Sequence, residues 1–333
     1  KQEIKDPLLK NFGDSMRIGQ NPAKFVNKVS KPAEITVAVL NYIPYQQGFY
    51  AEALEVLKAC LNSVRSESKQ AFDLMVFDNG SCETVQDFLL QEFRNHDIQF
   101  LVLSEKNLGK GGAWNIIFDA APGEYIAYAD SDVYFHKDWL NESLKIMQAF
   151  PNVGMVTARP FFTKKEFSTN TLNWAKSQPD VLFEQGKLIP WDTFLEFDLS
   201  LGQELSAIES EYQTNDIEKI SLNGVSAIIG GSHWQFLTRK NIIKEFLPFD
   251  MERPMGQVKL LDKRMNEVGF LRLMTPEPYA DNMSNTLKVN SVEKTQNKKN
   301  SKNKFVFNLL DLPIVKKILL TLHHRIFMFY YDR

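Results

Sequence analysis

The sequence predicts an α/β fold: a central, mostly parallel sheet with helices on both of its faces. Three observations support this prediction. Short apolar, β-branched runs recur along the first half of the chain, and such runs are typical of buried parallel strands. Each run is followed by a segment with helical spacing. Four of these strand-then-helix repeats fit within about a hundred residues, an alternation typical of parallel strands connected by helices.

The first repeat shows the pattern most clearly. The run ITVAVLNY, from Ile35, is a predicted strand, and the helix that follows it places Leu54, Leu57, Leu61 and Val64 at helical spacing. The next elements keep the same order: a strand at 72–81, a helix at 84–93, a strand at 98–107, a helix at 109–121 and a strand at 124–132. We expect these strands to lie side by side.

The second half of the chain is less regular. A helix at 139–150 and a strand at 152–160 are followed by polar and aromatic sequence at 163–215, which predicts loops and short helices around a cleft. Strand-then-helix order returns at 224–246. The helix from Val258 is amphipathic, and Gly269 is its stop signal.

Composition narrows the class of protein. The chain has 333 residues, 44% of them hydrophobic, and its 39 Lys and Arg against 41 Asp and Glu give a formal net charge of −2. This balance argues against a nucleic-acid partner. Cys60 and Cys82 have neither metal-ligand spacing nor the density of a disulfide scaffold, which favours a reducing compartment. No apolar run is long enough to cross a bilayer and no signal peptide opens the chain, so we expect a cytoplasmic protein.

The pattern divides the chain into five parts. They are an N-terminal extension (1–33), a first half of the α/β domain (34–160), a second half (161–287) with its insertion at 163–215, a Lys-rich linker (288–304) and an amphipathic helical tail (305–333). The tail has two interpretations. Its apolar side packs against its own domain, or residues 314–331 contact the inner face of a membrane, with the cations near anionic headgroups.

Two carboxylates end a strand that is otherwise apolar. Tyr125 to Ala129 predict a buried strand, and Asp130-Ser131-Asp132 follows at once. Ligands of open parallel sheets bind beyond the carboxyl ends of the strands, where Asp78 and Asn107 are also expected. An Asp-x-Asp turn can hold a hard cation such as Mg²⁺ or Mn²⁺. The alternative is that the turn only leads into the following helix.

The stretch NLGKGGAWN, residues 107–115, begins the third helix with glycines. Backbone N–H groups at such a helix start can approach a phosphate. The Gly-x-Gly-x-x-Gly spacing after the first strand and the Gly-Lys-Ser/Thr end of a P-loop are both absent, which disfavours a dinucleotide site and a P-loop.

Taken together and in order, ITVAVLNY, VFDNGS, NLGKGGAWN and GEYIAYADSD resemble the nucleotide-sugar half of a GT-A glycosyltransferase, in particular glycosyltransferase family 2. The resemblance is good over Ile35–Arg159 and loose over Gly224–Ser284. It implies the GT-A (nucleotide-diphospho-sugar transferase) fold, with residues 34–160 binding the donor and residues 161–287 the acceptor.

The resemblance also implies roles for single residues. Asn41 and Tyr42 match the segment that lines the nucleotide pocket, and Asp78 matches the carboxylate that accepts a hydrogen bond from the base. Asp132 would be the direct metal ligand, and Asp130 would face the ribose or the metal-bound waters. The other matches on the donor side are Asn107, Gly109 and Lys110 in the loop near the base and ribose, and Asn115 on the following helix.

Three of these residues also have plainer interpretations. Asp78 is an Asx-turn residue in one of them, and Asn107 caps the third helix. For Lys110, the sequence favours a solvated loop charge over a phosphate ligand.

The sequence departs from the family where the general base is expected. Gln257 and Val258 stand in place of the acidic pair that opens the corresponding helix, and neither accepts a proton usefully. Asp262 lies one helical turn further on, on roughly the same face, and is the first candidate for a displaced base. In the alternative it pairs with a Lys or Arg on an exposed helix. Other candidates are Asp192, Asp198, Asp250 and Glu252, and a retaining mechanism without a base stays open.

Four further residues are matched on the acceptor side. Asp281 stands where the family often has a metal-binding histidine, and a carboxylate suits Mn²⁺ or Mg²⁺. Gly231 lets a sugar approach the backbone, while His233 and Trp234 line the acceptor site. In the alternative, Trp234 is a core residue and His233 a partly buried, hydrogen-bonded one.

The resemblance implies a metal-dependent transfer of sugar from a nucleoside diphosphate donor, with uridine favoured, to a hydroxyl of a glycan or glycosylated carrier. Inversion is the expected stereochemistry. Two rival functions are a sugar-phosphate nucleotidyltransferase and a nucleotide- or glycan-binding module that has lost its base. The first is disfavoured because the loop after the first strand, which follows Asn41, contains no Arg or Lys up to Gly48.

Overall fold

The computed structural model describes residues 19–251 and 258–287. The chain divides into two compact units, Lys1–Pro32 and Ala33–Arg333, and each is described by itself. The described element of the first unit is the 3-10 helix η2 (Pro22–Phe25). The linker and tail expected at 288–304 and 305–333 lie outside the described residues.

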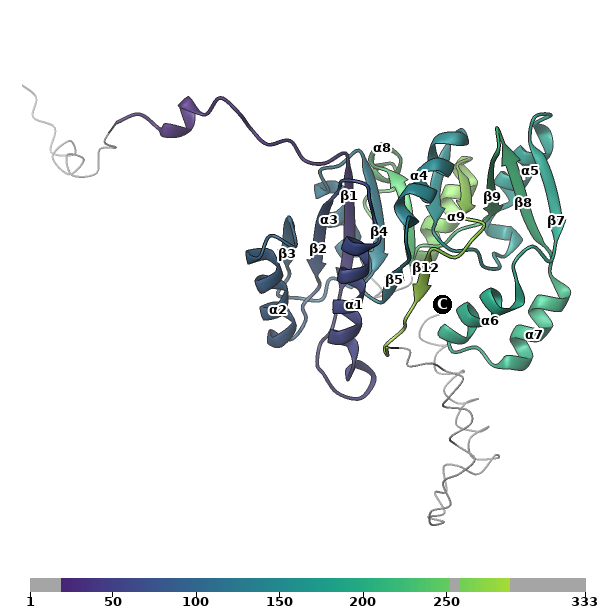
Figure 1. Ribbon diagram of the computed structural model, residues 1–333, viewed down its shortest axis with the longest axis horizontal. Helices are drawn as coiled ribbons and strands as arrows, with labels where there is room; N and C mark the ends of the chain where they lie inside the picture. The colour runs from purple at the N-terminus through teal and green to yellow at the C-terminus, as the bar shows by residue number, and fades with distance from the viewer. Residues whose placement is uncertain (1–18, 252–257, 288–333) are drawn as a thin grey trace, which may run out of the picture. The chain divides into compact units, whose positions relative to one another are not determined.

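Ten strands of the second unit form one sheet (Figure 1). From one edge to the other these are β3 (Phe100–Leu103), β2 (Asp73–Asp78), β1 (Ile35–Asn41), β4 (Tyr125–Asp130), β10 (Gln235–Arg239), β6 (Val153–Thr157), β11 (Leu271–Met274), β9 (Val225–Ile229), β8 (Ile217–Leu222) and β7 (Leu182–Gly186).

Most strands of this sheet point in one direction. β3, β2, β1 and β4 are paired in parallel, and so are β6 and β11. β10 is antiparallel to both of its neighbours, β4 and β6, and the pairings of β9 with β11, β8 with β9 and β7 with β8 are antiparallel too. Only β10, β9 and β7 are therefore reversed, and the predicted α/β fold with a mostly parallel sheet is confirmed.

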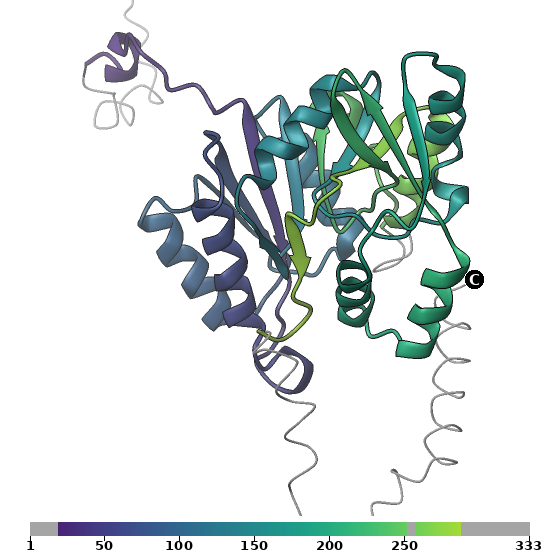
Figure 2. The ribbon, with the colours of Figure 1, turned by 45° about the vertical axis from the view of Figure 1, so that its right-hand side comes forward.

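Helices cover both faces of the sheet (Figures 1 and 2). Alternate residues of β1 belong to two different core clusters, as expected for a strand buried on both sides. Val37 and Val39 belong to the first cluster, and Ala38 and Leu40 to the second. The first includes residues of α1 (Ala53–Ser66), α2 (Glu83–Arg94) and α4 (Trp139–Ala149), and the second residues of α3 (Gly109–Ala120), α8 (Lys240–Lys244) and α9 (Val258–Val268).

The insertion at 163–215 contains the short helices that the sequence predicts and one strand that it does not. These elements are η4 (Lys165–Phe167), α5 (Thr169–Ser177), β7, α6 (Trp191–Ser200) and α7 (Leu205–Thr214). β7 is the edge strand of the sheet, and most of its side chains are exposed. α6 and α7 share a third core cluster with β8 and β9, in which Phe161 and Phe197 stack.

A second, two-stranded sheet lies next to the end of β4. β5 (Val133–Phe135) pairs antiparallel with β12 (Ala280–Asn282), so that Asp281 is opposite Tyr134. The Met283 N–H also donates to the Asp132 carbonyl oxygen at 2.8 Å. This small sheet therefore brings residues 281–285 next to the Asp130-Ser131-Asp132 turn.

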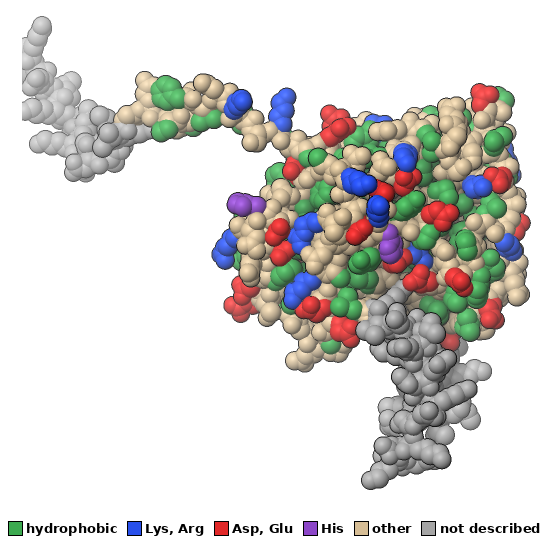
Figure 3. Space-filling model, in the orientation of Figure 1, with side chains coloured by type: hydrophobic (Ala, Val, Ile, Leu, Met, Phe, Trp, Pro, Cys, Tyr) green, Lys and Arg blue, Asp and Glu red, His purple; other side chains and the backbone are tan. Residues whose placement is uncertain are grey.

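Acidic, basic and apolar side chains are interspersed over the face seen in Figure 3. Within the described ranges, no helix combines the length and the hydropathy that a membrane span requires.

Candidate functional site

The carboxyl ends of three parallel strands meet at one edge of the sheet. In the register of the ladders, Asn41 of β1 is opposite Asp78 of β2, and Leu40 is opposite Asp130 of β4. The loops that follow these strands therefore converge, as expected for ligand sites of open α/β sheets.

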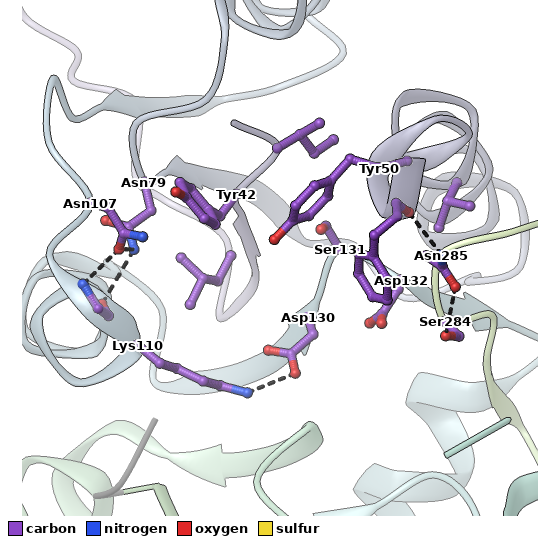
Figure 4. Close-up of a pocket in the computed structure, with 16 residues that line it drawn as sticks. Tyr42, Tyr50, Asn79, Asn107, Lys110, Asp130, Ser131, Asp132, Ser284 and Asn285 are labelled. Atoms are coloured by element: carbon purple, nitrogen blue, oxygen red, sulfur yellow. Dashed lines mark hydrogen bonds and ion pairs between the residues drawn. The ribbon is translucent and has the colours of Figure 1, made fainter. Parts of the chain in front are cut away.

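A cavity of about 400 Å³ lies at this edge (Figure 4). Six residues predicted from the sequence line it: Tyr42, Asn107, Gly109, Lys110, Asp130 and Asp132. Asn41, Asp78 and Asn115 do not. The remaining lining residues are Leu40, Ile43, Phe49, Tyr50, Ala53, Val56, Asn79, Ser131, Ser284 and Asn285.

Asp130 is bound on both oxygens. The Lys110 ammonium donates to Asp130 Oδ2 at 2.7 Å, and the Tyr128 hydroxyl donates to Oδ1 at 2.5 Å. Lys110 is 8% exposed, and its Nζ lies 5.4 Å from the centroid of the Trp114 ring and 5.6 Å from that of Tyr128. Lys110 is therefore a buried residue of α3 and not the solvated loop charge of the plainer interpretation. Its partner lies on β4, and two aromatic faces enclose it.

Asp132 is the less engaged of the two aspartates. No hydrogen bond or ion pair from another described side chain reaches its carboxylate. Burial, and secondly repulsion from Asp130, raise its pKa to about 7, while Lys110 opposes that rise. A further positive charge beside Asp132 would therefore stabilise its ionised form.

Asn79 holds the loop that carries Asn107 and Lys110. Its Nδ2 donates to Asn107 Oδ1 at 3.0 Å and to the Gly109 carbonyl at 3.3 Å, and its Oδ1 accepts from Leu108 N–H at 2.9 Å. Asn107 Oδ1 accepts from Gly109 N–H at 2.8 Å, so this side chain does bind the start of α3. We did not predict Asn79, although the turn Asp-Asn-Gly-Ser after β2 marked the position.

The glycines that open α3 make room for protein. A Cβ at Gly111 would lie 2.6 Å from the Asp250 carbonyl oxygen, and one at Gly112 would lie 2.9 Å from the Met251 side chain. Asn115 binds the same segment, because Phe249 N–H donates to its Oδ1 at 2.6 Å and its Nδ2 donates back to the Phe249 carbonyl at 2.9 Å. Both the oxygen and the nitrogen of the Asn115 side-chain amide are occupied in this way.

Asp78 and Asn41 are fully buried behind the cavity wall. Asp78 Oδ1 accepts from Asn41 Nδ2 at 2.8 Å, and its Oδ2 accepts from Ser81 N–H at 3.0 Å. The second contact is the local turn bond of the plainer interpretation. A bond from Asp78 to a nucleobase stays a prediction.

Aromatic residues after β1 form one side of the cavity. Tyr42, Phe49 and Tyr50 line it, and the rings of Tyr42, Tyr45 and Phe49 each pack edge-on against Tyr50. We predicted only Tyr42 of these four, although the density of aromatic residues in YIPYQQGFY is visible in the sequence.

Ser284 and Asn285 close the cavity from a distant part of the chain. Asn285 Nδ2 donates to the Phe49 carbonyl at 2.8 Å, and both residues are drawn beside Asp132 in Figure 4. Their position follows from the pairing of β12 with β5, which the sequence did not predict.

Asp281 is engaged by two cationic side chains. Its Oδ2 lies 2.8 Å from His136 Nε2, and its Oδ1 accepts from the Arg159 guanidinium. The bond to Asp281 raises the pKa of His136. In the described part of the chain, no three His, Cys, Asp or Glu side chains are grouped as a metal site. Metal binding by Asp281 stays a prediction.

On the other side of β4, three side chains form a buried network. Asp262 Oδ2 lies 2.7 Å from His233 Nδ1, and its Oδ1 accepts from Arg272 Nη2 at 2.7 Å. Asp262 is 6% exposed and Arg272 1%. The alternative interpretation is therefore right that Asp262 pairs with an Arg, and wrong that this position is exposed. Gln257 and Glu252 lie outside the described residues.

Gly231 and Trp234 also contact this region. The Gly231 carbonyl accepts from Arg272 Nη2, and the Trp234 carbonyl accepts from Asp130 N–H at 3.0 Å. The Trp234 ring packs against the core clusters beside Phe197, in line with its interpretation as a core residue. An acceptor role for these residues stays a prediction.

Part of this chain is similar to known proteins. Residues 49–198 match the family model Glycosyl transferase family 2. The resemblance to this family is confirmed. The matched part contains the Asp130-Ser131-Asp132 turn and the Lys110 loop, whereas His233 and Asp262 lie beyond it.

Two curated relatives carry glycosyltransferase names. The uncharacterized glycosyltransferase alr2836 of Nostoc sp. is 27% identical over 100 residues, which cover 30% of this chain and 31% of that protein. The amylovoran biosynthesis glycosyltransferase AmsB of Erwinia amylovora is 29% identical over 104 residues, 31% of this chain and 35% of the relative. The chain thus spans about a third of each relative.

Among solved structures, the mannosyltransferase PcManGT from Pyrobaculum calidifontis in complex with GDP-Man and Mn²⁺ is similar to this chain at a TM-score of 0.43 and 14% identity. The match covers 81% of this chain and 61% of that one. A likeness at this level carries no inference about ligands.

Proposed function

We propose that this protein is a metal-dependent glycosyltransferase that moves a sugar from a nucleoside diphosphate donor to a hydroxyl of a glycan or glycosylated carrier. One observation carries the proposal. The Asp130-Ser131-Asp132 turn and the segment that carries Asn107 and Lys110 are about twenty residues apart in sequence, yet they line one cavity in the part of the chain related to glycosyltransferases. UDP-sugars are the favoured donors, a preference that rests on the family resemblance at Asp78.

The carboxylates fit a divalent cation. Asp132 is the direct ligand in this proposal, because its carboxylate is not bound by another described side chain and its pKa is raised to about 7 by burial and by Asp130. Asp130, held by Lys110 and Tyr128, adds negative charge beside it. Mg²⁺ or Mn²⁺ is typically bound by one or two carboxylates together with substrate phosphates, and supplies charge stabilisation to the departing diphosphate.

The chain's own groups position the rest of the donor. Asn79 fixes the 107–110 loop, so the loop is ordered before a ligand arrives, which lowers the entropic penalty of binding. Tyr42 and Tyr50 present flat apolar surface across the cavity from Lys110 (Figure 4). We propose that the nucleoside contacts these rings and the diphosphate faces Asp132.

Thermal melting tests the donor site. The native chain, Asp132→Ala and the control Asp87→Ala are each melted with UDP, GDP, CDP and dTDP, with and without Mn²⁺. Asp87 is an exposed residue of α2. Ligand at about a hundred times its Kd adds roughly 2.7 kcal/mol, which raises Tm by about 5–11 °C for a domain of this size. We expect a metal-dependent shift with UDP that Asp132→Ala loses and Asp87→Ala keeps.

Turnover separates the proposal from its rivals. Release of UDP from a UDP-sugar in the presence of metal would exclude a module that only binds. Formation of a UDP-sugar from UTP and a sugar 1-phosphate would identify a nucleotidyltransferase instead. The absence of a melting shift with all four nucleotides would refute the donor site itself. We propose inversion on the family resemblance, and a cytoplasmic location on the sequence pattern. The 314–331 segment, for which the sequence leaves a membrane contact open, lies outside the described residues.

A further inference from the structure

We propose that His233, held in place by Asp262, is the catalytic base that takes the proton of the attacking hydroxyl. This inference rests on the proposed function and names a residue for its chemical step. It replaces the first candidate from the sequence, Asp262, by the side chain that Asp262 orients.

Asp262 is committed to two partners. Oδ1 binds Arg272, whose guanidinium is 1% exposed, and Oδ2 binds His233, both at 2.7 Å. Both carboxylate oxygens of Asp262 are thus occupied by partners within the protein. Asp262 is therefore poorly suited to accept a substrate proton directly.

The same contact defines the tautomer of His233. An ionised carboxylate only accepts hydrogen bonds, so Nδ1, 2.7 Å from Asp262 Oδ2, carries the ring proton. Nε2 then presents a lone pair. No described residue bonds Nε2, and 21% of the side chain is exposed.

His233 lies at the same strand end as the donor carboxylates. The carbonyl of the next residue, Trp234, accepts from Asp130 N–H at 3.0 Å. The His233 ring meets the Trp114 ring with 6.5 Å between centroids, and Trp114 is the ring beside which Lys110 reaches Asp130. The imidazole is thus separated by the Trp114 ring from the Lys110–Asp130 pair, and both residues of that pair line the cavity.

Two glycines shape the approach to His233. Gly230 and Gly231 have φ of +139° and +152°, a region that favours glycine. A Cβ at Gly230 would clash with Thr163 Oγ1, and one at Gly231 would lie 3.2 Å from the Met155 sulfur. The loop that delivers His233 therefore packs tightly against neighbouring strands, which fixes the position of the ring.

The step balances without another reactant. The acceptor hydroxyl gives its proton to His233 Nε2 as its oxygen forms a bond to the anomeric carbon. The bond from that carbon to the diphosphate oxygen breaks, and its electron pair leaves with the nucleoside diphosphate. The imidazolium is stabilised by Asp262 and returns its proton to solvent. Charged groups near the ring include Asp262 with Arg272 and, beyond Trp114, Lys110 with Asp130.

The kinetic test replaces His233 by Asn, whose amide N–H can keep the bond to Asp262 while the acceptor nitrogen is lost. UDP release from UDP-glucose, UDP-galactose and UDP-N-acetylglucosamine is measured with Mn²⁺, with water as the acceptor. For the donor that turns over, we expect kcat to fall by about 10²–10⁴-fold, the acidic limb of the kcat–pH profile to disappear, and the UDP melting shift to remain. In His233→Ala, added imidazole should restore part of kcat.

The control is His96→Asn. His96 is exposed after α2, with φ of +65°, which Asn tolerates. It should keep the native kcat and the acidic limb. Native kcat in His233→Asn, with a change in KM alone, would make His233 a binding residue and overturn the inference while leaving the proposed function intact.

A second measurement does not depend on turnover. Long-range ¹H–¹⁵N spectra of the full chain, labelled at histidine and assigned through His233→Asn, report the tautomer of this ring. We expect an Nδ1–H imidazole whose Nε2 resonance shifts when UDP and Mg²⁺ are added. An Nε2–H tautomer in the native chain would overturn the inference whatever the donor assays give.

Discussion

The buried pair of Asp262 and Arg272 gives the sharpest prediction about stability. Asp262→Asn keeps the shape of the side chain and removes its charge. The Arg272 guanidinium, 1% exposed, would keep its bonds to the Phe167 and Gly231 carbonyls but lose its counter-charge. Burial lowers the pKa of this guanidinium, and Asp262 opposes that effect. The ion pair with Asp262 thus compensates for the hydration that the buried Arg272 guanidinium has lost.

The magnitude follows from the burial of both partners. Breaking a buried ion pair by removing one partner costs about 3–5 kcal/mol. At roughly 2–4 °C per kcal/mol for a domain of this size, Asp262→Asn should lower Tm by about 6–20 °C. Glu267→Gln is the matched control on the same helix. It removes an exposed pair with Lys263 at 3.7 Å, and should change stability by less than about 0.5 kcal/mol.

Urea unfolding followed by both fluorescence and circular dichroism measures these differences and tests for two-state behaviour. The double variant Asp262→Leu/Arg272→Met should recover most of the loss, because removing both charges leaves no buried ion without a partner. Asp262→Asn within about 0.5 kcal/mol of the native chain would refute the reasoning. It would mean that water or another group solvates Arg272.

Two further changes test other parts of the domain. Tyr128→Phe removes the buried hydroxyl that donates to Asp130 at 2.5 Å, and should cost about 1.5–3 kcal/mol in urea unfolding because the acceptor is charged. Tyr125→Phe on the same strand should be nearly neutral, and equal losses would contradict the assignment. Asp198 is 7% exposed, and its Oδ2 has no hydrogen-bond partner among the described residues. Burial, as the larger cause, and repulsion from Glu211, as the smaller, raise the pKa of Asp198 from 3.8 to about 6. As the pH rises, the unfolded state releases the Asp198 proton near pH 4, whereas the folded state keeps it until about pH 6. The free energy of unfolding therefore falls between about pH 4 and about pH 6, by at most about 3 kcal/mol. Asp198→Asn should remove this loss, so that its Tm is higher than that of the native chain at pH 8 but not at pH 4. Asp192→Asn, at an exposed position, should leave Tm unchanged at both pH values. Equal effects of the two variants would refute the role of burial.

The sequence predicted the parts of the site that depend on local pattern. Asp130 and Asp132 were recognised because an apolar strand ends on them, and Asn107 and Gly109 because they precede a helix. These features follow from the periodicity of neighbouring residues. The carboxyl ends of parallel strands then had to meet at one edge, which the register of Asn41 with Asp78 shows.

Contacts between distant segments were harder to predict. Lys110 is buried because Trp114, Tyr128 and Asp130 surround it, and two of these lie on another element. The strands β5 and β12 have three residues each, too few for a period to be recognised. The position of Asn285 beside the cavity depends on the pairing of β5 with β12. The sequence therefore could not predict that position.

The direction of β10 explains why His233 is adjacent to Asp130. β10 is antiparallel to β4, so its first residues, after Gly231 and His233, lie beside the last residues of β4. A parallel strand in the same place would have brought its carboxyl end, near Arg239, to that edge. The reversed strand therefore places the turn before it beside the Asp130-Ser131-Asp132 turn, while α9, which packs in the second core cluster, supplies Asp262. In the proposed reaction, the base and the leaving group need to lie on opposite sides of one reacting carbon. β10, antiparallel to both of its neighbours, brings the turn that carries His233 to the end of β4 through the bond between Asp130 N–H and the Trp234 carbonyl.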